Sequence, residues 1–289
     1  MKFSLIVAII LTILYGILVA ISNVGTETNA QRYLRKNQDV VVSYVSTKPQ
    51  LVLAGSSLTA ALKNSGFETC TYNLGLIGES PLTGLDVVID RVWKPKMVFV
   101  EINFPEGDSN SNLIQRKESW LVKYLPNIIY VAPITNLVQN VVISLRRLRV
   151  ETLSKDSIAS TASGTEAETA RQAELKIQQV FFEKKIENTH LKYKLVEFGM
   201  KIQKLLNNGV NVVLFEVPVH PSLEETPRAK QIREAFRVGF PDLRMVSAEM
   251  LSRGVSIKTA DGLHLNDDDS SNVLKNFSPE FQAVCESLP

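Results

Sequence analysis

Two short stretches far apart in the chain carry residue types that together could catalyse acyl transfer. The first is Gly55–Ser56–Ser57, which follows an apolar run, and the second is Asp261–Gly262–Leu263–His264, near the C-terminal end. An imidazole can take the proton of a serine hydroxyl, and a carboxylate can orient that imidazole and stabilise its charged form. Taken separately, the stretches have simpler interpretations, the serines as helix caps and the Asp–His pair as part of an ordinary loop.

The serine stretch has the pattern of a buried strand, a tight turn and a helix start. The apolar residues 51–54 precede Gly55 and the two serines, and a helix-compatible run continues to about Gly66. Open α/β sheets place their active sites at the carboxyl ends of their strands. A serine at this position also lies at a helix N-terminus, where free backbone N–H groups can stabilise an anion.

Further strand–turn–helix units predict the sheet that would position these residues. A strand over 69–74 is followed by Gly75 and Gly78, and a strand over 97–102 is followed by Asn103. The pattern returns later in the chain, with strands at 211–217 and 244–246 and helices at 224–238 and from about 267 to 287. Such units predict an α/β fold, a three-layer doubly wound parallel sheet of the flavodoxin-like kind.

The predicted carboxyl ends of the strands bring the candidate residues to one edge of the sheet. Ser57, Gly78, Asn103 and His264 all lie at such ends or in the turns after them. An acyl-transfer site needs a nucleophile, a base with its orienting group, and donors for an oxyanion. These positions supply each of those groups.

The middle of the chain reads as a helical insertion at about 104–208 within a domain that covers 50–289. Residues 134–150 have a helical pattern, and 152–168 are rich in Ser, Thr and Ala without periodicity, which predicts a disordered segment. A single long helix is predicted over about 170–207 and ends at Asn208–Gly209.

The N-terminus predicts a membrane anchor. Residues 3–21 are almost entirely apolar, which is enough to span a bilayer as a helix. We expect an uncleaved transmembrane signal anchor over 3–22, a juxtamembrane connection over 23–49, and a catalytic domain outside the cytoplasm, in the periplasm or at the cell surface. A cleaved signal peptide remains the alternative. Arg32, Arg35 and Lys36 oppose this orientation.

Composition restricts the chemistry. The net charge of +2 over 289 residues gives no basic field for nucleic acid. Cys70 and Cys285 are the two cysteines, and no CxxC pair occurs, so we expect no zinc site built on cysteine. We expect no other metal and no cofactor. The cysteines could form one disulfide in an oxidising compartment, although the sequence does not show whether they are close. Any histidine chemistry must use His190, His220 or His264.

The motifs resemble those of the SGNH (GDSL-like) hydrolase superfamily. Residues 55–58 resemble its first block, Gly-Asp-Ser-Leu, with Ser56 in place of the aspartate, and residues 73–78 resemble the second block. Asn103 matches the asparagine of the third block, and residues 261–264 match the DxxH of the fifth.

This resemblance implies a role for each residue. Ser57 would be the nucleophile, His264 the base and Asp261 its orienting group. The backbone N–H groups of Ser57 and Gly78 and the side-chain amide of Asn103 would form the oxyanion hole.

The chain also departs from the superfamily pattern, at Ser56 and at Phe104, which follows the asparagine of the third block. A membrane-anchored form with two serines resembles branches that O-acylate polysaccharides, including the alginate O-acetyltransferase type. A loop like residues 217–221 follows a late strand in that type, so His220, like Ser56, is a candidate substrate-binding residue. His220 could equally make only a structural hydrogen bond.

The sequence therefore predicts an extracytoplasmic serine esterase or O-acyltransferase, with acetyl as the expected acyl group. It would use an acyl donor and a carbohydrate acceptor, a cell-surface or exported polysaccharide, and polysaccharide-assembly proteins are candidate partners. The alternative is a non-catalytic assembly or binding protein with the same fold. A lipid-directed thioesterase or lysophospholipase is a weaker third interpretation.

Overall fold

The computed structural model describes residues 29–63, 70–116 and 164–286. The larger of its two compact units, residues 37–114 and 164–289, contains a five-stranded sheet in which every strand pair is parallel. The strand order β2-β1-β3-β4-β5 is that of flavodoxin-like sheets. The predicted doubly wound parallel sheet is therefore confirmed. Its strands are β1 Leu51–Gly55, β2 Thr71–Gly75, β3 Met97–Glu101, β4 Asn211–Phe215 and β5 Arg244–Val246.

The register aligns the carboxyl ends of the central strands. Leu51 pairs with Thr71 on one side and with Met97 on the other, and Gly55 pairs with Gly75. Since the strands are parallel, the residues that follow β2, β1 and β3 all emerge at the same edge of the sheet. This edge carries the candidate site.

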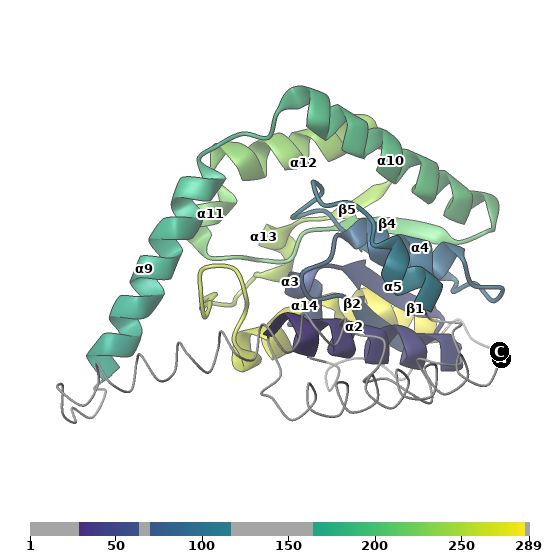
Figure 1. The fold of residues 1–289 in the computed structure, drawn as a ribbon, viewed down its shortest axis with the longest axis horizontal. Helices are drawn as coiled ribbons and strands as arrows, with labels where there is room; N and C mark the ends of the chain where they lie inside the picture. The colour runs from purple at the N-terminus through teal and green to yellow at the C-terminus, as the bar shows by residue number, and fades with distance from the viewer. Residues whose placement is uncertain (1–28, 64–69, 117–163, 287–289) are drawn as a thin grey trace, which may run out of the picture. The chain divides into compact units, whose positions relative to one another are not determined.

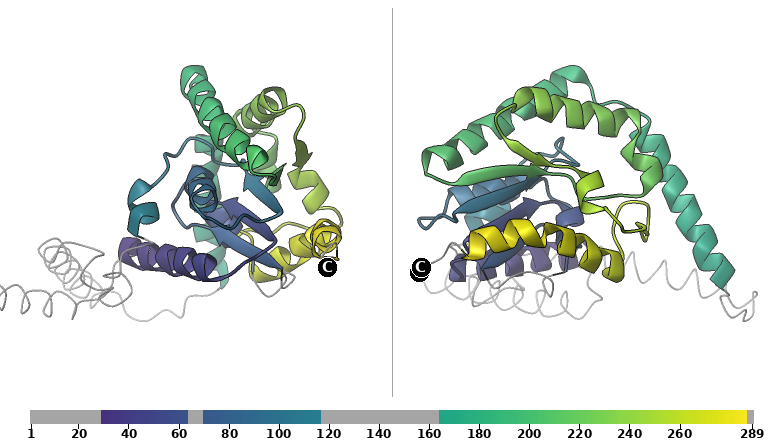
Figure 2. Two further views of the ribbon diagram at one scale, coloured as in Figure 1. Left: turned by 90° about the vertical axis from the view of Figure 1, so that its right-hand side faces the viewer. Right: turned by 180° about the vertical axis from the view of Figure 1, so that it is seen from behind.

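Helices cover both faces of the sheet, because its strands are apolar on both sides (Figures 1 and 2). Val98 and Val100 of β3 belong to the core on one face, whereas Phe99 belongs to the core on the other. The first core is completed by α2 Asn29–Ser46, α4 Pro81–Ile89, α10 Asn188–Asn207 and α12 Pro227–Gly239. The second is completed by α3 Ser57–Ala60, α13 Ala248–Leu251 and α14 Asp267–Glu286.

Helix α2 occupies much of the stretch predicted as a juxtamembrane connection. Its residues Val41 and Tyr44 are buried in the first core, and the Asn37 side chain exchanges two hydrogen bonds of 2.8 Å with the backbone of Ile77. The chain therefore joins the sheet domain before residue 49.

The apolar run over 3–22, like the helix predicted over 134–150, lies outside the described residues. Within the described ranges, no helix is both long enough and apolar enough to cross a bilayer. The membrane anchor thus stays a prediction.

The single long helix predicted over 170–207 is wrong, because the structure has two helices there, α9 Gly164–Phe182 and α10. Between them, the backbone N–H of Ile186 donates to Gln231 and its carbonyl accepts from the same side chain, at 2.7 and 2.9 Å. Arg228 donates to the carbonyl of Lys184 at 3.2 Å. Side chains of α12 therefore satisfy the backbone groups that the break exposes. The start of α9 also makes residues 164–168 helical, where disorder was predicted; residues 152–163 are not described.

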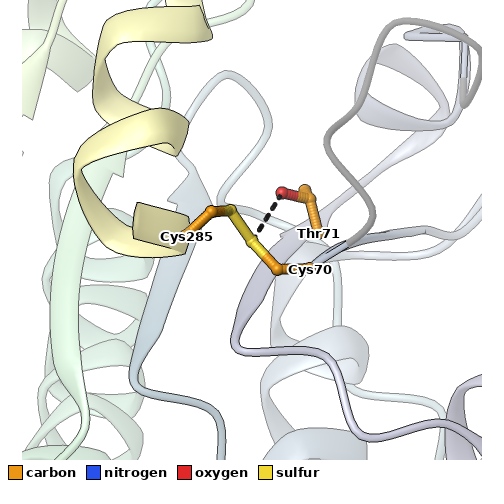
Figure 3. The surroundings of a disulfide bond; sticks show 3 residues. All are labelled: Cys70, Thr71 and Cys285. Carbon is orange, nitrogen blue, oxygen red and sulfur yellow. Dashed lines mark hydrogen bonds between the residues drawn. A yellow bond between two sulfur atoms is a disulfide. The ribbon is translucent and has the colours of Figure 1, made fainter. Parts of the chain in front are cut away.

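Cys70 and Cys285 form a disulfide (Figure 3), which settles the question that the sequence left open. Cys70 immediately precedes β2, and Cys285 lies in the last turn of α14, 215 residues further along the chain. The bond fastens the C-terminal helix to the amino end of the sheet, opposite the edge that carries the candidate site.

Candidate active site

Ser57, His264 and Asp261 form a continuous chain of hydrogen bonds. The Oγ of Ser57 lies 2.9 Å from Nε2 of His264, although the two residues are 207 positions apart in sequence. The Nδ1 of His264 lies 2.6 Å from Oδ2 of Asp261. Both histidine and aspartate side chains are about one-third exposed, which leaves the group accessible to a substrate. The structure thus brings together the three residues singled out in the sequence.

The hydrogen bonds of Asp261 determine which nitrogen of His264 carries the proton. Burial alone would raise the pKa of Asp261, but hydrogen bonds from the His264 ring and from the backbone N–H groups of His264 and Leu263 outweigh it and lower the pKa to about 2. An ionised carboxylate only accepts hydrogen bonds, so Nδ1 of His264 must donate. In the neutral ring, Nε2 then presents its lone pair to the Ser57 hydroxyl, which is the arrangement of a general base.

The serine turn, residues 55–59, sets the position of Ser57. Ser56 is the N-cap of α3, with its Oγ accepting from the backbone N–H of Leu58 at 3.2 Å. Ser57 is the first residue of this short helix, so its own backbone N–H has no acceptor within the helix. The cap and the candidate nucleophile are therefore different, adjacent serines.

Glu101, at the end of β3, is a contributor that sequence reasoning missed. Its fully buried carboxylate accepts hydrogen bonds from Ser56 and Thr59, on either side of Ser57. Burial raises the pKa of Glu101, and the hydrogen bonds from Ser56 and Thr59 partly oppose this rise. The sequence did offer one signal, which is that an acidic residue ends the otherwise apolar strand Met97–Glu101. An acidic residue that continues an apolar strand is a candidate for burial, and a buried carboxylate needs hydrogen-bond partners.

Ser56 is accordingly not brought to the accessible surface of the site. It is 5% exposed, and its hydroxyl donates to Oε1 of Glu101 at 2.6 Å. This location speaks against the substrate-binding role predicted for Ser56 and gives it a supporting one.

The histidine turn, residues 259–265, is a small closed loop. Thr259 and Leu265 form an antiparallel bridge, and the N–H of Ala260 donates to the carbonyl of His264 at 2.9 Å. Oδ1 of Asp261 accepts the backbone N–H groups of Leu263 and His264 at 2.9 and 2.8 Å. Gly262 has a φ of +91° and lies against Leu175 of α9, so a side chain there would be strained and crowded. The turn therefore holds both reactive side chains on one short segment.

The C-terminal side of α3 is tied to the start of α14, which follows the histidine turn. The hydroxyl of the buried Ser270 donates to the carbonyl of Ala61 at 3.1 Å and accepts from the N–H of Lys63 at 3.0 Å. Asn73 of β2 donates to the carbonyls of Thr59 and Leu62 at 2.8 and 2.7 Å. These contacts fix the serine turn relative to the histidine turn.

Gly78 and Asn103 follow the two strands that flank β1. Gly78 has a φ of +74°, and no heavy atom lies within 4 Å of the place where a Cβ would stand. The amide of Asn103 pairs with the backbone of Val217, with Nδ2 donating to its carbonyl and Oδ1 accepting its N–H, both at 2.8 Å. This pairing uses one of the two Nδ2 hydrogens and fixes the plane of the amide.

His220 lies beside the histidine turn. Its backbone N–H donates to the carbonyl of Gly262 at 2.9 Å, and its Nδ1 accepts from the backbone N–H of Ser222 at 3.2 Å, as the cap of α11 Pro221–Glu224. His220 also lines a cavity of about 400 Å³, together with residues of α9 and of the histidine turn. Both interpretations of His220, the structural bond and the lining of a cavity, thus have support. The other lining residues are Glu168, Arg171, Gln172, Leu175, Ile257, Lys258, Thr259, Ala260 and Gly262.

Over the described ranges, no three His, Cys, Asp or Glu side chains cluster as a metal site would require. Comparison of the chain with known proteins gave no matching family model and no matching curated protein.

Proposed function

We propose that this protein is a serine esterase or O-acyltransferase of the SGNH (GDSL-like) type. The observation that carries the proposal is the hydrogen-bonded chain from Asp261 through His264 to Ser57, at the carboxyl edge of a parallel sheet. A lone Ser–His contact has structural explanations. A serine at a helix start, facing the unprotonated nitrogen of a histidine whose other nitrogen is held by an ionised carboxylate, is what nucleophilic acyl transfer requires.

The reaction would proceed through an acyl-enzyme. Ser57 Oγ attacks the carbonyl carbon of an ester while Nε2 of His264 takes the hydroxyl proton. The resulting tetrahedral oxyanion collapses, and His264 returns the proton to the departing alcohol. A second hydroxyl, from water or from a sugar, then gives its proton to His264 and attacks the acyl-serine, which releases the acid or the new ester and regenerates Ser57.

The oxyanion would be stabilised by three donors. They are the backbone N–H of Ser57, which has no acceptor within α3, the N–H of Gly78, and the second Nδ2 hydrogen of Asn103. Each follows one of three adjacent strands whose ends are in register. Loss of one such donor typically costs about 10²–10³-fold in kcat.

The acceptor that we propose is a cell-surface or exported polysaccharide, and acetyl is the proposed acyl group. The lining of the cavity beside the histidine turn includes the polar side chains of Arg171, Lys258 and His220, which suits a hydroxyl-rich ligand. A domain outside the cytoplasm is supported by the disulfide, since such bonds persist in oxidising compartments. Anchoring through residues 3–22 and association with polysaccharide-assembly proteins belong to the same proposal.

The test uses an acetyl ester as donor, with acetate release and sugar acetylation measured with and without oligosaccharide acceptors. We expect the wild type to release acetate and Ser57→Ala to lose at least about 10³-fold of that rate. The control is Ser247→Ala, because Ser247 also lies at the start of a short helix that follows a strand, α13 after β5, and is not part of the candidate site. Equal rates for wild type and Ser57→Ala would refute the proposal and favour a non-catalytic assembly protein. Acetylated oligosaccharide among the products would identify a transferase, and acetate alone an esterase.

A further inference from the structure

Within the part of the chain that the structure describes, the carboxylate of Glu101 makes four hydrogen bonds, all to the serine turn. Its Oε2 accepts from the backbone N–H of Ser56 at 2.8 Å, from the backbone N–H of Thr59 at 3.2 Å and from the Thr59 hydroxyl at 2.5 Å. Its Oε1 accepts from the hydroxyl of Ser56 at 2.6 Å. These partners lie immediately before Ser57 and two residues after it.

The partners are matched to an acceptor. A backbone N–H can only donate, so Oε2 accepts from the N–H groups of Ser56 and Thr59. The Ser56 hydroxyl already accepts the N–H of Leu58 and can turn its own hydrogen toward Oε1. Among the residues that the structure describes, no cation forms an ion pair with Glu101, and it is 0% exposed. Its polar contacts are therefore directed to the serine turn.

The backbone leaves room for this carboxylate only because residue 55 is a glycine. A Cβ at Gly55 would lie 2.5 Å from Oε2 of Glu101 and 1.9 Å from Oγ1 of Thr59. Both distances are shorter than the 3.0 Å below which Cβ atoms in real proteins essentially never approach another heavy atom. Gly55, the last residue of β1, therefore leaves the space that the side chain of Glu101, the last residue of β3, occupies next to the serine turn.

We propose that Glu101 is a positioning residue that holds the serine turn from within the sheet and thereby sets where Ser57 Oγ meets its substrate. This inference rests on the proposed function. Glu101 touches neither Ser57 Oγ nor the accessible surface and acts through Ser56 and Thr59. A displacement of about 1 Å at a reacting atom can cost about 10²-fold in rate, so the support of a nucleophile matters beyond its contribution to stability.

Glu216 offers a matched control at the neighbouring strand. It directly follows β4, as Glu101 ends β3, and it is also nearly buried, at 6%. Its carboxylate pairs with Arg233 at 2.9 and 3.1 Å and accepts the backbone N–H of Ala248 at 3.3 Å. None of these partners belongs to the serine turn. Replacing Glu216 should therefore affect stability without reaching Ser57.

The experiment compares Glu101→Met, Glu101→Gln and Glu216→Met by kcat and KM for an acetyl ester and by thermal unfolding. Methionine keeps the length of the side chain and removes all four bonds. Glutamine keeps an acceptor at Oε2 and can donate its amide N–H to the Ser56 hydroxyl. We expect kcat to fall about 10²-fold in Glu101→Met with KM within threefold, because the turn shifts while the substrate-binding surface stays. We expect a loss of at most about threefold in Glu101→Gln, and none in Glu216→Met.

A graded pair of variants serves if Glu101→Met does not fold. Thr59→Val removes the 2.5 Å hydrogen bond from the Thr59 hydroxyl to Glu101, and Ser56→Ala removes the hydroxyl that donates to Glu101 at 2.6 Å. We expect kcat to fall about three- to tenfold in each variant and further in the double variant. Unchanged kcat in folded Glu101→Met, or in the folded double variant, overturns the positioning role. So does an equal fall in Glu216→Met, since that would be a general effect of destabilisation. Failure of the proposed function is distinct, because wild type and Ser57→Ala would then have equal rates.

Discussion

The serine turn and the histidine turn are each supported by one carboxylate, in opposite surroundings. Glu101 is fully buried and bonded to hydroxyl and N–H groups, and burial raises its pKa. Asp261 is one-third exposed, and its hydrogen bonds, chiefly from the His264 ring, lower its pKa to about 2. In the proposed mechanism the difference separates two tasks, since Asp261 would act on the charge of His264 whereas Glu101 would act on the position of Ser57. Replacement by an uncharged amide should therefore preserve most of the activity at Glu101 but not at Asp261.

The largest expected effect is that of Asp261→Asn, the same amide replacement made in the histidine turn. Asparagine keeps an acceptor for the two backbone N–H groups but can present its amide donor to Nδ1, which favours the wrong ring tautomer of His264. We expect kcat for an acetyl ester to fall by about 10³–10⁴-fold, against at most about threefold for Glu101→Gln. Similar losses in the two variants would remove the distinction between the turns.

The next largest effect should come from Gly55→Ala, which tests the packing of the serine turn. The added methyl group would overlap Oε2 of Glu101 and the hydroxyl of Thr59. Overpacking of this kind costs about 1–3 kcal/mol of unfolding free energy. We also expect kcat to fall by about 10²-fold, because the turn must move to make room. Urea unfolding measures the free energy of unfolding and ester hydrolysis measures kcat. A variant that matches the wild type in both would show that the serine turn accommodates the methyl group without cost, which contradicts the tight packing around Gly55.

A smaller effect on activity is expected from reduction of the disulfide, which lies at the opposite edge of the sheet from both turns. Opening a native disulfide costs about 2–5 kcal/mol of unfolding free energy. At 25 °C, where the reduced protein should remain folded, we expect ester hydrolysis to stay within twofold. The double variant Cys70→Ser/Cys285→Ser should reproduce both results. A larger loss of activity in the folded protein would mean that α14 transmits strain to the histidine turn.

The smallest expected effects are the opposite pH dependences of stability that the two carboxylates predict. Because the pKa of Asp261 is lowered on folding from 3.8 to about 2, its contribution to the free energy of unfolding is present above about pH 4 and is lost as the pH falls toward 2. Because folding raises the pKa of Glu101 from 4.5, its contribution to the free energy of unfolding is present below about pH 4.5. That contribution is lost as the pH rises through the pKa that Glu101 has in the folded protein.

These signs can be read from melting temperatures. The difference between wild type and Asp261→Asn should shrink from pH 4 to pH 2. The difference between wild type and Glu101→Gln should shrink as the pH rises above about 4.5. Differences that move in the same direction would contradict the assignment of opposite pKa shifts.

Much of this arrangement could be predicted from the sequence, because local signals carry it. Apolar runs such as 51–54 and 97–100, ended by Gly or by polar residues, predicted the parallel strands and the edge at which they end. Ser57 and the pair Asp261 and His264 stood out because their residue types are reactive and their positions follow predicted strands.

Other features depend on contacts between distant segments, which no local pattern contains. The backbone groups exposed by the break between α9 and α10 form hydrogen bonds with Gln231 and Arg228, which belong to a helix more than 40 residues further on. Glu101 contacts the serine turn because β3 lies beside β1. The pairing of Cys70 with Cys285 required the path of α14 across the sheet. Ser56 was a candidate substrate-binding residue because its partner Glu101, on another strand, could not be recognised from the sequence.

The central claim, that Ser57 is a nucleophile activated by His264, is tested most directly with a fluorophosphonate probe and peptide mapping by mass spectrometry. The account predicts a single labelled residue, Ser57, and a labelling rate that falls by at least about 10²-fold in His264→Ala and is unchanged in Ser247→Ala. Absence of labelling at Ser57 in the folded wild-type protein, or labelling that proceeds equally well in His264→Ala, would contradict it.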